Sequence, residues 1–260
     1  MRRRPSAQIR TASGRSRASS RGVFTLSGVL ACVVLAALFL SACSGGGDSP
    51  KPVPTPEAVA LLKVAADKMA AVKTFHFILD HENGGTPIIN SLSMRRAEGD
   101  MDVPDKMRAD VSAVAPSFGN LRVDVQVVAV GDTAKITNPF NRARWEPLPG
   151  KTPLSAIFDP AAGAVALLRS VTDAHITGTE KINGIDTWKV EGPLKATDLV
   201  AFMPTAEAGY TLKGTAWIGQ TDKQLYRVRL EGAAGADDAP NVVRKLDFSK
   251  YDQPVTIELP

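Results

Sequence analysis

Alternation of apolar and polar residues with a period of two recurs along most of the chain after residue 74. In Leu121–Val127, leucine and valine alternate with Arg122, Asp124 and Gln126. Such runs are typical of antiparallel strands that turn one face to solvent. Comparable runs occupy Phe75–Asp80, Ile88–Met101, Met107–Ala113, Val171–Lys181, Ile185–Glu191, Leu212–Ile218, Gln224–Glu231 and Val242–Lys250.

Turn residues separate these runs, and three segments have helical character. Asn83-Gly84-Gly85 and Asn183-Gly184 are typical of tight turns between strands. A helix is predicted to begin at Thr55-Pro56-Glu57 and to end near Lys73, because apolar residues recur there at three- and four-residue spacing. Its predicted apolar stripe contains Val59, Leu62, Ala66, Met69 and Val72. Two shorter helices are predicted over Pro160–Ser170 and Lys195–Phe202.

These elements predict an α+β fold with a single curled antiparallel sheet and about three helices. Strands this numerous must curl or split, because a flat sheet would expose too much apolar area. So few helices cannot cover the whole apolar face, and the uncovered part becomes a hydrophobic cavity. The same residue pattern also describes a fully packed core, since protein interiors are normally close-packed.

The N-terminal segment has the order of parts of a secretory signal. An Arg- and Ser-rich stretch precedes Val23–Leu40, which carries no charge, and the small residues Ser41-Ala42 precede Cys43. Leu40-Ser41-Ala42-Cys43 resembles the lipobox of bacterial lipoproteins, in which the cysteine is acylated and becomes the new N-terminus. The alternative is that Val23–Leu40 remains as an uncleaved membrane anchor. Both alternatives place the remaining chain on the extracytoplasmic face of the cell membrane.

We therefore expect three regions along the chain. Residues 1–42 form a lipoprotein signal peptide, and residues 43–56 form the acylated Cys43 with a flexible Gly- and Pro-rich tether. Residues 57–260 form a single folded domain. The two cysteines are Cys32 and Cys43, so this domain has no disulfide and no cysteine nucleophile.

Charge argues against nucleic acid as a partner. The chain has 31 Lys and Arg against 27 Asp and Glu, a net charge of +4. Seven arginines precede Cys43, so 24 basic residues remain after it against all 27 acidic ones, a net charge of −3. The excess of basic residues belongs to the signal segment, and a basic patch for phosphate contacts is not expected in the domain.

Catalytic and metal-binding motifs are not found in the sequence. The three histidines, His76, His81 and His175, lack the i, i+4 spacing of a helical zinc site, and there is no Gly-x-Ser-x-Gly motif or phosphate-binding loop. Asp80-His81-Glu82 is the densest titratable cluster, and we interpret it as a solvated turn before Asn83. No catalytic residue, metal site or cofactor is therefore predicted.

Four stretches in the mature region resemble one family of bacterial lipoproteins. They are Ile157–Pro160, the hairpin Thr179–Gly184 that leads to Trp188, Thr215–Gly219 with Leu225–Val228, and Asp247–Tyr251 with Pro254–Ile257. With the lipobox, they resemble the mycobacterial LppX/LprA/LprF/LprG lipoproteins over about residues 57–260, and more widely the LolA and LolB carriers. Asp252 stands where that family commonly has glycine. The resemblance implies a half-barrel sheet curled around helices on its concave side, with a hydrophobic cavity for acyl chains of lipids or glycolipids.

We therefore expect a membrane-anchored carrier of acylated lipids that performs no covalent chemistry. Cys43 is the predicted lipid anchor, and a membrane transporter is a candidate partner. Two alternatives remain: a sensor or scaffold that binds a protein partner in envelope regulation or transport, and a hydrolase without a recognised motif. Alternation selects one face of the sheet as the cavity lining, with Phe77, Leu79, Val111, Val123, Val125 and Val127, joined by Val165 and Leu168 from the middle helix.

Overall fold

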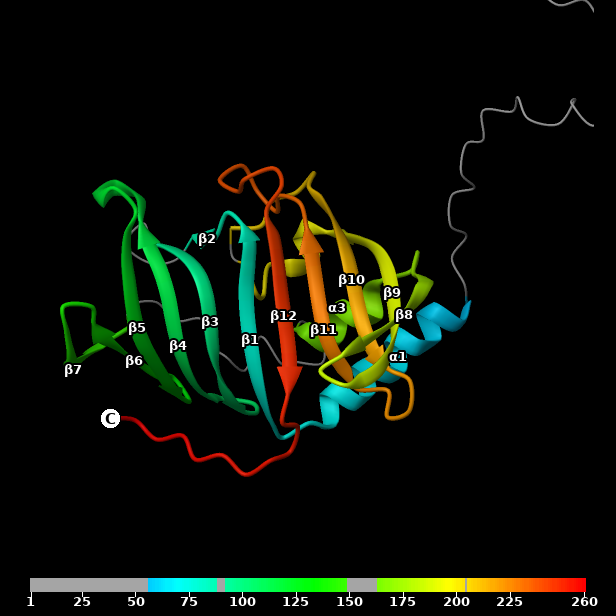
Figure 1. Ribbon diagram of the computed structural model, residues 1–260, viewed down its shortest axis with the longest axis horizontal. Helices are drawn as coiled ribbons and strands as arrows, with labels where there is room; N and C mark the ends of the chain where they lie inside the picture. The colour runs from blue at the N-terminus through cyan, green and yellow to red at the C-terminus, as the bar shows by residue number, and fades with distance from the viewer. Residues whose placement is uncertain (1–55, 88–91, 149–162, 204) are drawn as a thin grey trace, which may run out of the picture. The chain divides into compact units, whose positions relative to one another are not determined.

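One antiparallel sheet contains all the strands of the described residues (Figure 1). The structure is a computed structural model that describes residues 56–87, 92–148, 163–203 and 205–260. The predicted signal peptide, Cys43 and nearly all of the predicted tether lie outside these ranges.

Strands predominate among the described residues, and the two α-helices, α1 and α3, lie in separate parts of the chain. In chain order the elements are α1 (Pro56–Ala71), β1 (Thr74–Asn83), β2 (Thr86–Pro87), β3 (Ser93–Asp102), β4 (Lys106–Ala115), η2 (Pro116–Phe118), β5 (Leu121–Val130), β6 (Thr133–Asn138), β7 (Asn141–Pro147), α3 (Ala164–Ser170), β8 (His175–Ile182), β9 (Ile185–Lys195), η3 (Ala196–Leu199), β10 (Thr211–Gly219), β11 (Leu225–Glu231) and β12 (Val243–Ser249).

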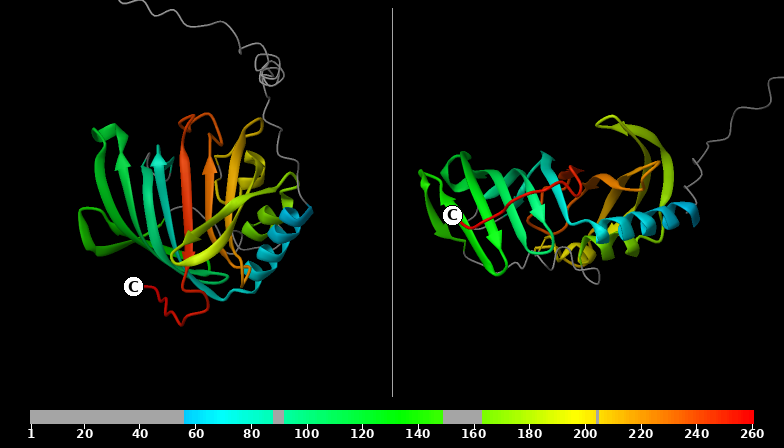
Figure 2. Two further views of the ribbon diagram at one scale, coloured as in Figure 1. Left: turned by 45° about the vertical axis from the view of Figure 1, so that its right-hand side comes forward. Right: turned by 90° about the horizontal axis from the view of Figure 1, so that it is seen from below.

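Strands that are neighbours in the sheet mostly follow one another in the chain, and the exception on the main path is β12, which lies next to β1. The order is β7-β6-β5-β4-β3-β1-β12-β11-β10-β9-β8, with β2 paired to β3 beside this path. The last strand, β12, lies between β1 and β11 and so joins the two halves of the sheet. Every pairing is antiparallel, and the sheet curves along its length with α1 against one face (Figure 2). The prediction of a single curled antiparallel sheet is confirmed.

Register makes one face of the sheet apolar. Leu79 on β1 pairs with Leu246 on β12, which pairs with Val228 on β11. On the other side, Leu79 pairs with Ala97 on β3. Paired residues lie on the same face, so a single apolar row crosses nine strands. The full row is Val125, Val111, Ala97, Leu79, Leu246, Val228, Ala216, Val190 and Ile176. We call this the inner face.

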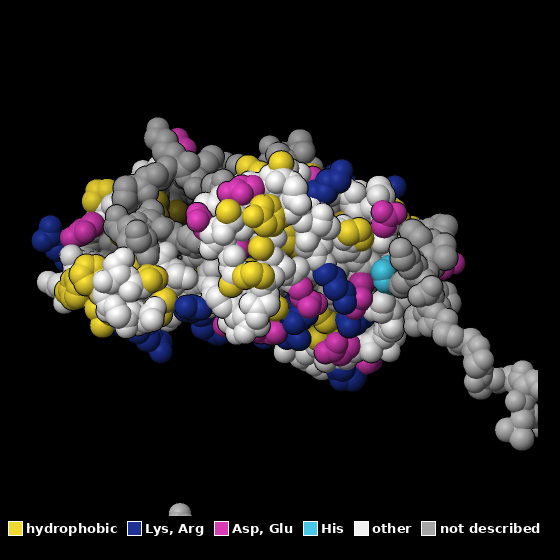
Figure 3. All heavy atoms as spheres, turned by 90° about the horizontal axis from the view of Figure 1, so that it is seen from above, with side chains coloured by type: hydrophobic (Ala, Val, Ile, Leu, Met, Phe, Trp, Pro, Cys, Tyr) yellow, Lys and Arg dark blue, Asp and Glu magenta, His cyan; other side chains and the backbone are white. Residues whose placement is uncertain are grey.

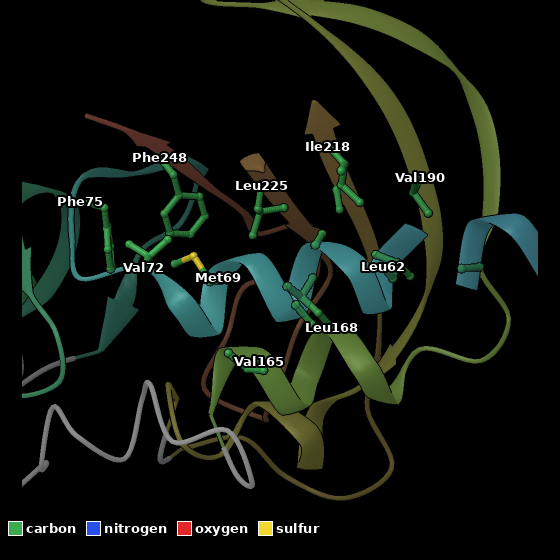
Figure 4. Packing of buried hydrophobic residues seen from close by; sticks show 14 of the residues in the cluster. Leu62, Met69, Val72, Phe75, Val165, Leu168, Val190, Ile218, Leu225 and Phe248 are labelled. Atoms are coloured by element: carbon green, nitrogen blue, oxygen red, sulfur yellow. The ribbon is translucent and has the colours of Figure 1, made fainter. Parts of the chain in front are cut away.

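The two α-helices of the described residues pack on the inner face. From α1, Leu62, Ala66 and Met69 are buried as predicted, Val72 is buried directly after the helix ends, and Val59 is partly buried against the same cluster. Figure 4 shows α1 between α3 and the strand residues Ile218, Leu225 and Phe248. Within the described residues, no helix is long and apolar enough to cross a membrane.

The predicted number of helices is wrong, since about three were expected and the described residues form two α-helices. Over Lys195–Phe202 the structure has a four-residue 3₁₀ helix, η3, because β9 extends through Lys195 and leaves no room for an α-helix before the turn at Phe202–Met203. Helix α3 occupies Ala164–Ser170, the second part of its predicted range, and residues 160–162 lie outside the described residues.

Strands β6 and β7 were not predicted. Their sequences, TAKITN and NRARWEP, have little apolar alternation, and β7 carries Arg142, Arg144 and Glu146. They lie at one end of the sheet, and end strands commonly carry charged residues that discourage further pairing. Weak alternation at this position therefore follows from the topology.

Candidate functional site

A cavity of about 310 Å³ lies between the inner face of the sheet and the helices. That volume falls at the lower end of the range for small-molecule sites. Its described lining is mostly apolar and comes from both halves of the sheet, from α1 and α3, and from the segment around η3. The apolar lining residues are Leu62, Phe75, Phe77, Leu79, Met94, Met101, Met107, Leu167, Leu168, Val171, Val190, Leu194, Leu199, Phe202, Met203, Ala216, Leu225, Val228, Leu230, Leu246 and Phe248.

Three of the eight residues predicted to line the cavity do so. Phe77 and Leu79 contribute from β1, and Leu168 contributes from α3. Val165, also on α3, is buried in the cluster that α1, α3 and the sheet form, and it is not among the described lining residues. Both residues chosen on α3 pack in this cluster, and only Leu168 is among the described residues that line the cavity.

The other four predicted residues form part of a neighbouring cluster on β4 and β5. Phe77 and Leu79 also pack against this cluster, so its residues share the inner face, as alternation predicts. None of the four is among the described residues that line the cavity. A role for them in ligand contact stays a prediction. They are Val111, Val123, Val125 and Val127.

Aromatic side chains cluster at one end of the cavity. The Phe75 ring meets the Phe248 ring edge to face at 5.7 Å between centroids, and it lies 6.5 Å from the Phe77 ring. Tyr251 lies 6.5 Å from Phe75. The phenylalanine rings carry no polar atoms, so their packing makes this end of the cavity apolar.

The opposite end of the cavity is polar, and Arg244 is its centre. Arg244 precedes Leu246 and Phe248 on the inner face of β12, because every second residue points the same way. It is only 5% exposed. Arg244 and Phe248 are four residues apart, so the two ends are separated by roughly 13 Å. Figure 3 views the face at this end of the strands, where apolar side chains lie between charged ones.

A chain of hydrogen bonds fixes the Arg244 guanidinium. Its Nη2 donates to Asp238 Oδ1 at 2.7 Å, and its Nε donates to Thr86 Oγ1 at 3.2 Å. Thr86 Oγ1 lies 2.8 Å from His81 Nε2, while His81 Nδ1 lies 3.0 Å from the Arg95 carbonyl oxygen. The carbonyl can only accept, so Nδ1 carries the proton and Nε2 accepts from the Thr86 hydroxyl.

Burial lowers the pKa of His81 below its ordinary value of 6.5, and the positive charges of Arg244 and Arg95 lower it further. The hydrogen bond to the Arg95 carbonyl and the charge of Asp238 act in the opposite direction but do not prevail. His81 is therefore neutral at pH 7. Since Arg244 and Asp238 form a pair, these three side chains together carry no net charge.

The lowered pKa predicts that stability falls with acidification. The unfolded chain takes up a proton at His81 near pH 6.5, whereas the folded chain resists until a lower pH. The contribution of neutral His81 is complete above pH 6.5 and is lost as the pH falls from there toward the folded pKa. Urea unfolding at pH 7.5 and 5.5 should show a smaller free energy of unfolding at pH 5.5, and His81→Gln should reduce this difference. An unchanged difference in the variant would contradict the assignment.

Arg244 was not among the predicted site residues, and the interpretation of His81 as part of a solvated turn is wrong. Alternation within Val242–Lys250 places Arg244 on the face of Leu246 and Phe248, and a charged residue at such a position was the available signal. Asp80 and Glu82 lie on the other face, where they pair with Arg96 and Arg229. Asp80-His81-Glu82 is therefore not simply a solvated turn, because its middle residue points inward.

Two further polar residues border the cavity without offering their side chains to it. Glu191 follows the inward-facing Val190, and its carboxylate is bonded to Lys189 and Lys213 at 3.0 Å each. Thr215 pairs directly with Glu191 and so shares that outer face. Thr86 and Arg244 are consequently the polar side chains that the described lining presents.

Other titratable clusters lie away from the cavity. His76 faces outward from β1, with Nδ1 2.8 Å from Asp100 and Nε2 3.4 Å from Glu98. No group of three or more His, Cys, Asp or Glu side chains suited to a metal ion occurs within the described ranges. Neither observation supplies a catalytic centre beside the cavity.

The architecture and the cavity define a class: a single curled antiparallel sheet whose inner face and few helices enclose an apolar space with one polar end. The model of the LppX_LprAFG lipoprotein family matches residues 57–257, and the chain belongs to that family. The resemblance seen in the sequence is thereby confirmed.

Curated relatives and solved structures agree with this membership. The chain is 26% identical over 218 residues to the lipoarabinomannan carrier protein LprG of Mycolicibacterium smegmatis, covering 83% of this chain and 90% of that one. It is 28% identical over 239 residues to the protein of the same name from Mycobacterium tuberculosis, covering 89% and 94%. The crystal structure of LprF from Mycobacterium bovis aligns with a TM-score of 0.64 at 20% identity, covering 80% and 99% of the two chains. The crystal structure of LppX from Mycobacterium tuberculosis gives 0.57 at 21%, covering 78% and 99%.

Proposed function

We propose that this protein is a membrane-anchored extracytoplasmic carrier that holds the acyl chains of lipids or glycolipids in its cavity and moves them between the membrane and the cell envelope. The apolar cavity carries this proposal. Its described lining presents only Thr86 and Arg244 as polar side chains, so an apolar ligand replaces water there at little polar cost.

Energetics favour a chain-like ligand. Each methylene transferred from water into an apolar site contributes about 0.8 kcal/mol, so the affinity grows with the length of acyl chain enclosed. The relatives support the same ligand class, since two of them are named lipoarabinomannan carriers and a shorter match, 32% identical over 105 residues, is named a putative phthiocerol dimycocerosate transporter. No covalent step is needed for loading or release, and we propose none.

Release of the ligand requires a competing apolar environment. A bilayer or the binding site of a membrane transporter offers one, and the ligand then changes place without crossing water. Vesicles of phosphatidylcholine that contain a fluorescent acyl lipid test this directly. The protein should accelerate movement of the probe to acceptor vesicles, and the rate should rise with protein concentration. Movement no faster than without protein would contradict a carrier function.

Anchoring at Cys43 completes the proposal. A diacylated cysteine supplies the two or more acyl chains that stable anchoring takes, and the Gly- and Pro-rich tether separates the folded region from the membrane. Cys43→Ala should release the protein into the soluble fraction of cells and leave lipid binding unchanged. Fractionation followed by lipid loading of the released protein measures both. Retention of the variant in the membrane would favour Val23–Leu40 as an uncleaved anchor.

A scaffold that binds a protein partner is the alternative. It uses the same fold and needs no ligand in the cavity, so a protein that takes up no lipid probe would favour it. The hydrolase alternative has one supporting contact, the Thr86 hydroxyl beside His81 Nε2. Incubation with acyl esters and measurement of released fatty acid tests that alternative.

A further inference from the structure

We propose that Arg244 is the polar anchor of the cavity and donates a hydrogen bond from Nη1 to the ester carbonyl oxygen at the head of a bound acyl chain. This inference rests on the proposed binding of acyl chains and adds the linkage chemistry that the site recognises. It concerns the polar end of the cavity, which the carrier proposal itself does not need.

Arg244 has one nitrogen left over after its protein contacts. Nε donates to Thr86 and Nη2 donates to Asp238, whereas Nη1 is buried and has no acceptor in the described part of the chain. Buried donors without acceptors are rare, because each one costs free energy relative to its hydrated state. The side chain is 6% exposed and lines the cavity, so an acceptor carried by a ligand can reach it.

The charge balance of this end selects a neutral acceptor. Asp238, whose side chain is 7% exposed, already compensates the guanidinium, and its other oxygen accepts from the backbone N–H of Ala234 at 2.8 Å. His81 is neutral, since its pKa is lowered. A buried phosphate would therefore add a negative charge that no buried positive side chain described at this end compensates, whereas a carbonyl oxygen adds no charge. The Arg95 guanidinium also acts on His81, but it is exposed and donates to the Gly84 carbonyl oxygen.

The position of Arg244 along the cavity also suits an ester group at the head of an acyl chain. Arg244, Leu246 and Phe248 succeed one another on the inner face of β12, and the aromatic cluster lies at the far end. A chain that enters with its methyl end toward Phe248 places its ester group at Arg244. The anchor thus sets the depth and direction of an acyl chain, which apolar contacts alone leave undefined.

Ester- and ether-linked lipids of equal chain length test the inference on the unaltered protein. Diacyl phosphatidylcholine carries the carbonyl groups, whereas the dialkyl ether analogue lacks them and keeps the same headgroup. The protein should bind the ester form about tenfold more tightly, the value of one hydrogen bond from a charged donor. The double variant Arg244→Met/Asp238→Asn, which leaves no unpaired carboxylate, should bring the ratio close to one. Lys245→Met, the adjacent outward-facing residue of β12, is the matched control and should keep the wild-type ratio.

Each other outcome has a distinct meaning. Equal binding of the two linkages by the wild type overturns the inference and leaves the carrier proposal intact, while uptake of neither lipid contradicts the carrier proposal. A third arm compares phosphatidic acid with phosphatidylcholine. A preference for phosphatidic acid that Arg244→Met/Asp238→Asn removes, with no ester preference, would place a phosphate at Arg244 and overturn the carbonyl assignment.

Discussion

Val228→Trp is expected to weaken lipid binding strongly while the protein remains folded. Val228 lies on the inner face of β11, pairs with Leu246 and Ala216, and lines the cavity. It is partly buried, so an indole can extend into the cavity space instead of into packed protein. If the indole displaces about three methylene groups, binding weakens by about 2.4 kcal/mol, or roughly fiftyfold.

A surface variant controls for the size and chemistry of tryptophan. Lys213→Trp places the same side chain on the outer face of the neighbouring strand β10, where the Lys213 ammonium forms an ion pair with Glu191. Binding of a fluorescent acyl lipid should fall for Val228→Trp and stay near the wild-type value for Lys213→Trp, with both variants cooperatively folded by circular dichroism. Equal binding by wild type and Val228→Trp would show that the ligand lies elsewhere.

Arg244→Met is expected to destabilise the folded protein by about 3–5 kcal/mol, because it leaves the Asp238 carboxylate buried without its partner. That is a large part of the 5–15 kcal/mol typical of a folded domain. Arg244→Met/Asp238→Asn should recover much of the loss, since no unpaired charge remains. Urea unfolding at pH 7.5 measures both free energies of unfolding.

Lys245→Met is again the control, and it should change the free energy of unfolding by less than about 0.5 kcal/mol, because Lys245 faces outward and is partly exposed. Equal destabilisation of the single and double Arg244 variants would show that the unpaired carboxylate is not the cause. An unchanged free energy of unfolding in Arg244→Met would contradict the buried position of the guanidinium.

Local pattern predicts the sheet well, because alternation records which side of a strand is buried. Phe77 and Leu79 were placed correctly on the inner face, and Leu62, Ala66 and Met69 were placed correctly on the buried side of α1. Strands without strong apolar alternation were not predicted. Strands β6 and β7 lie at the end of the sheet and do not need the apolar alternation of buried strands.

The position of the cavity on the inner face could not be predicted from the strands alone. Val125 and Val228 belong to the same apolar row and have equivalent patterns, yet only Val228 is among the described lining residues. The difference depends on where α1 and α3 pack, which is a long-range property. Leu168 was predicted because α3 was expected to face the sheet, while Val165 on the same helix is packed in the core.

The polar end depends on even more distant contacts. Thr86 and Arg244 are separated by 158 residues, and they meet because β12 inserts beside β1. Alternation in β12 could have shown that Arg244 points inward. It could not have shown that Asp238 and Thr86 accept from two of its nitrogens, and that the third nitrogen has no acceptor among the described residues.

Native mass spectrometry of protein purified from a mycobacterial host tests the central claim, occupancy of the cavity by acyl chains, most directly. We expect an added mass on the wild-type protein that organic extraction removes, and acyl-bearing lipid in the extract. The added mass should be much reduced in Val228→Trp and retained in Lys213→Trp. A wild-type protein that carries no lipid and takes up none when acyl lipid is supplied would contradict occupancy of the cavity by acyl chains.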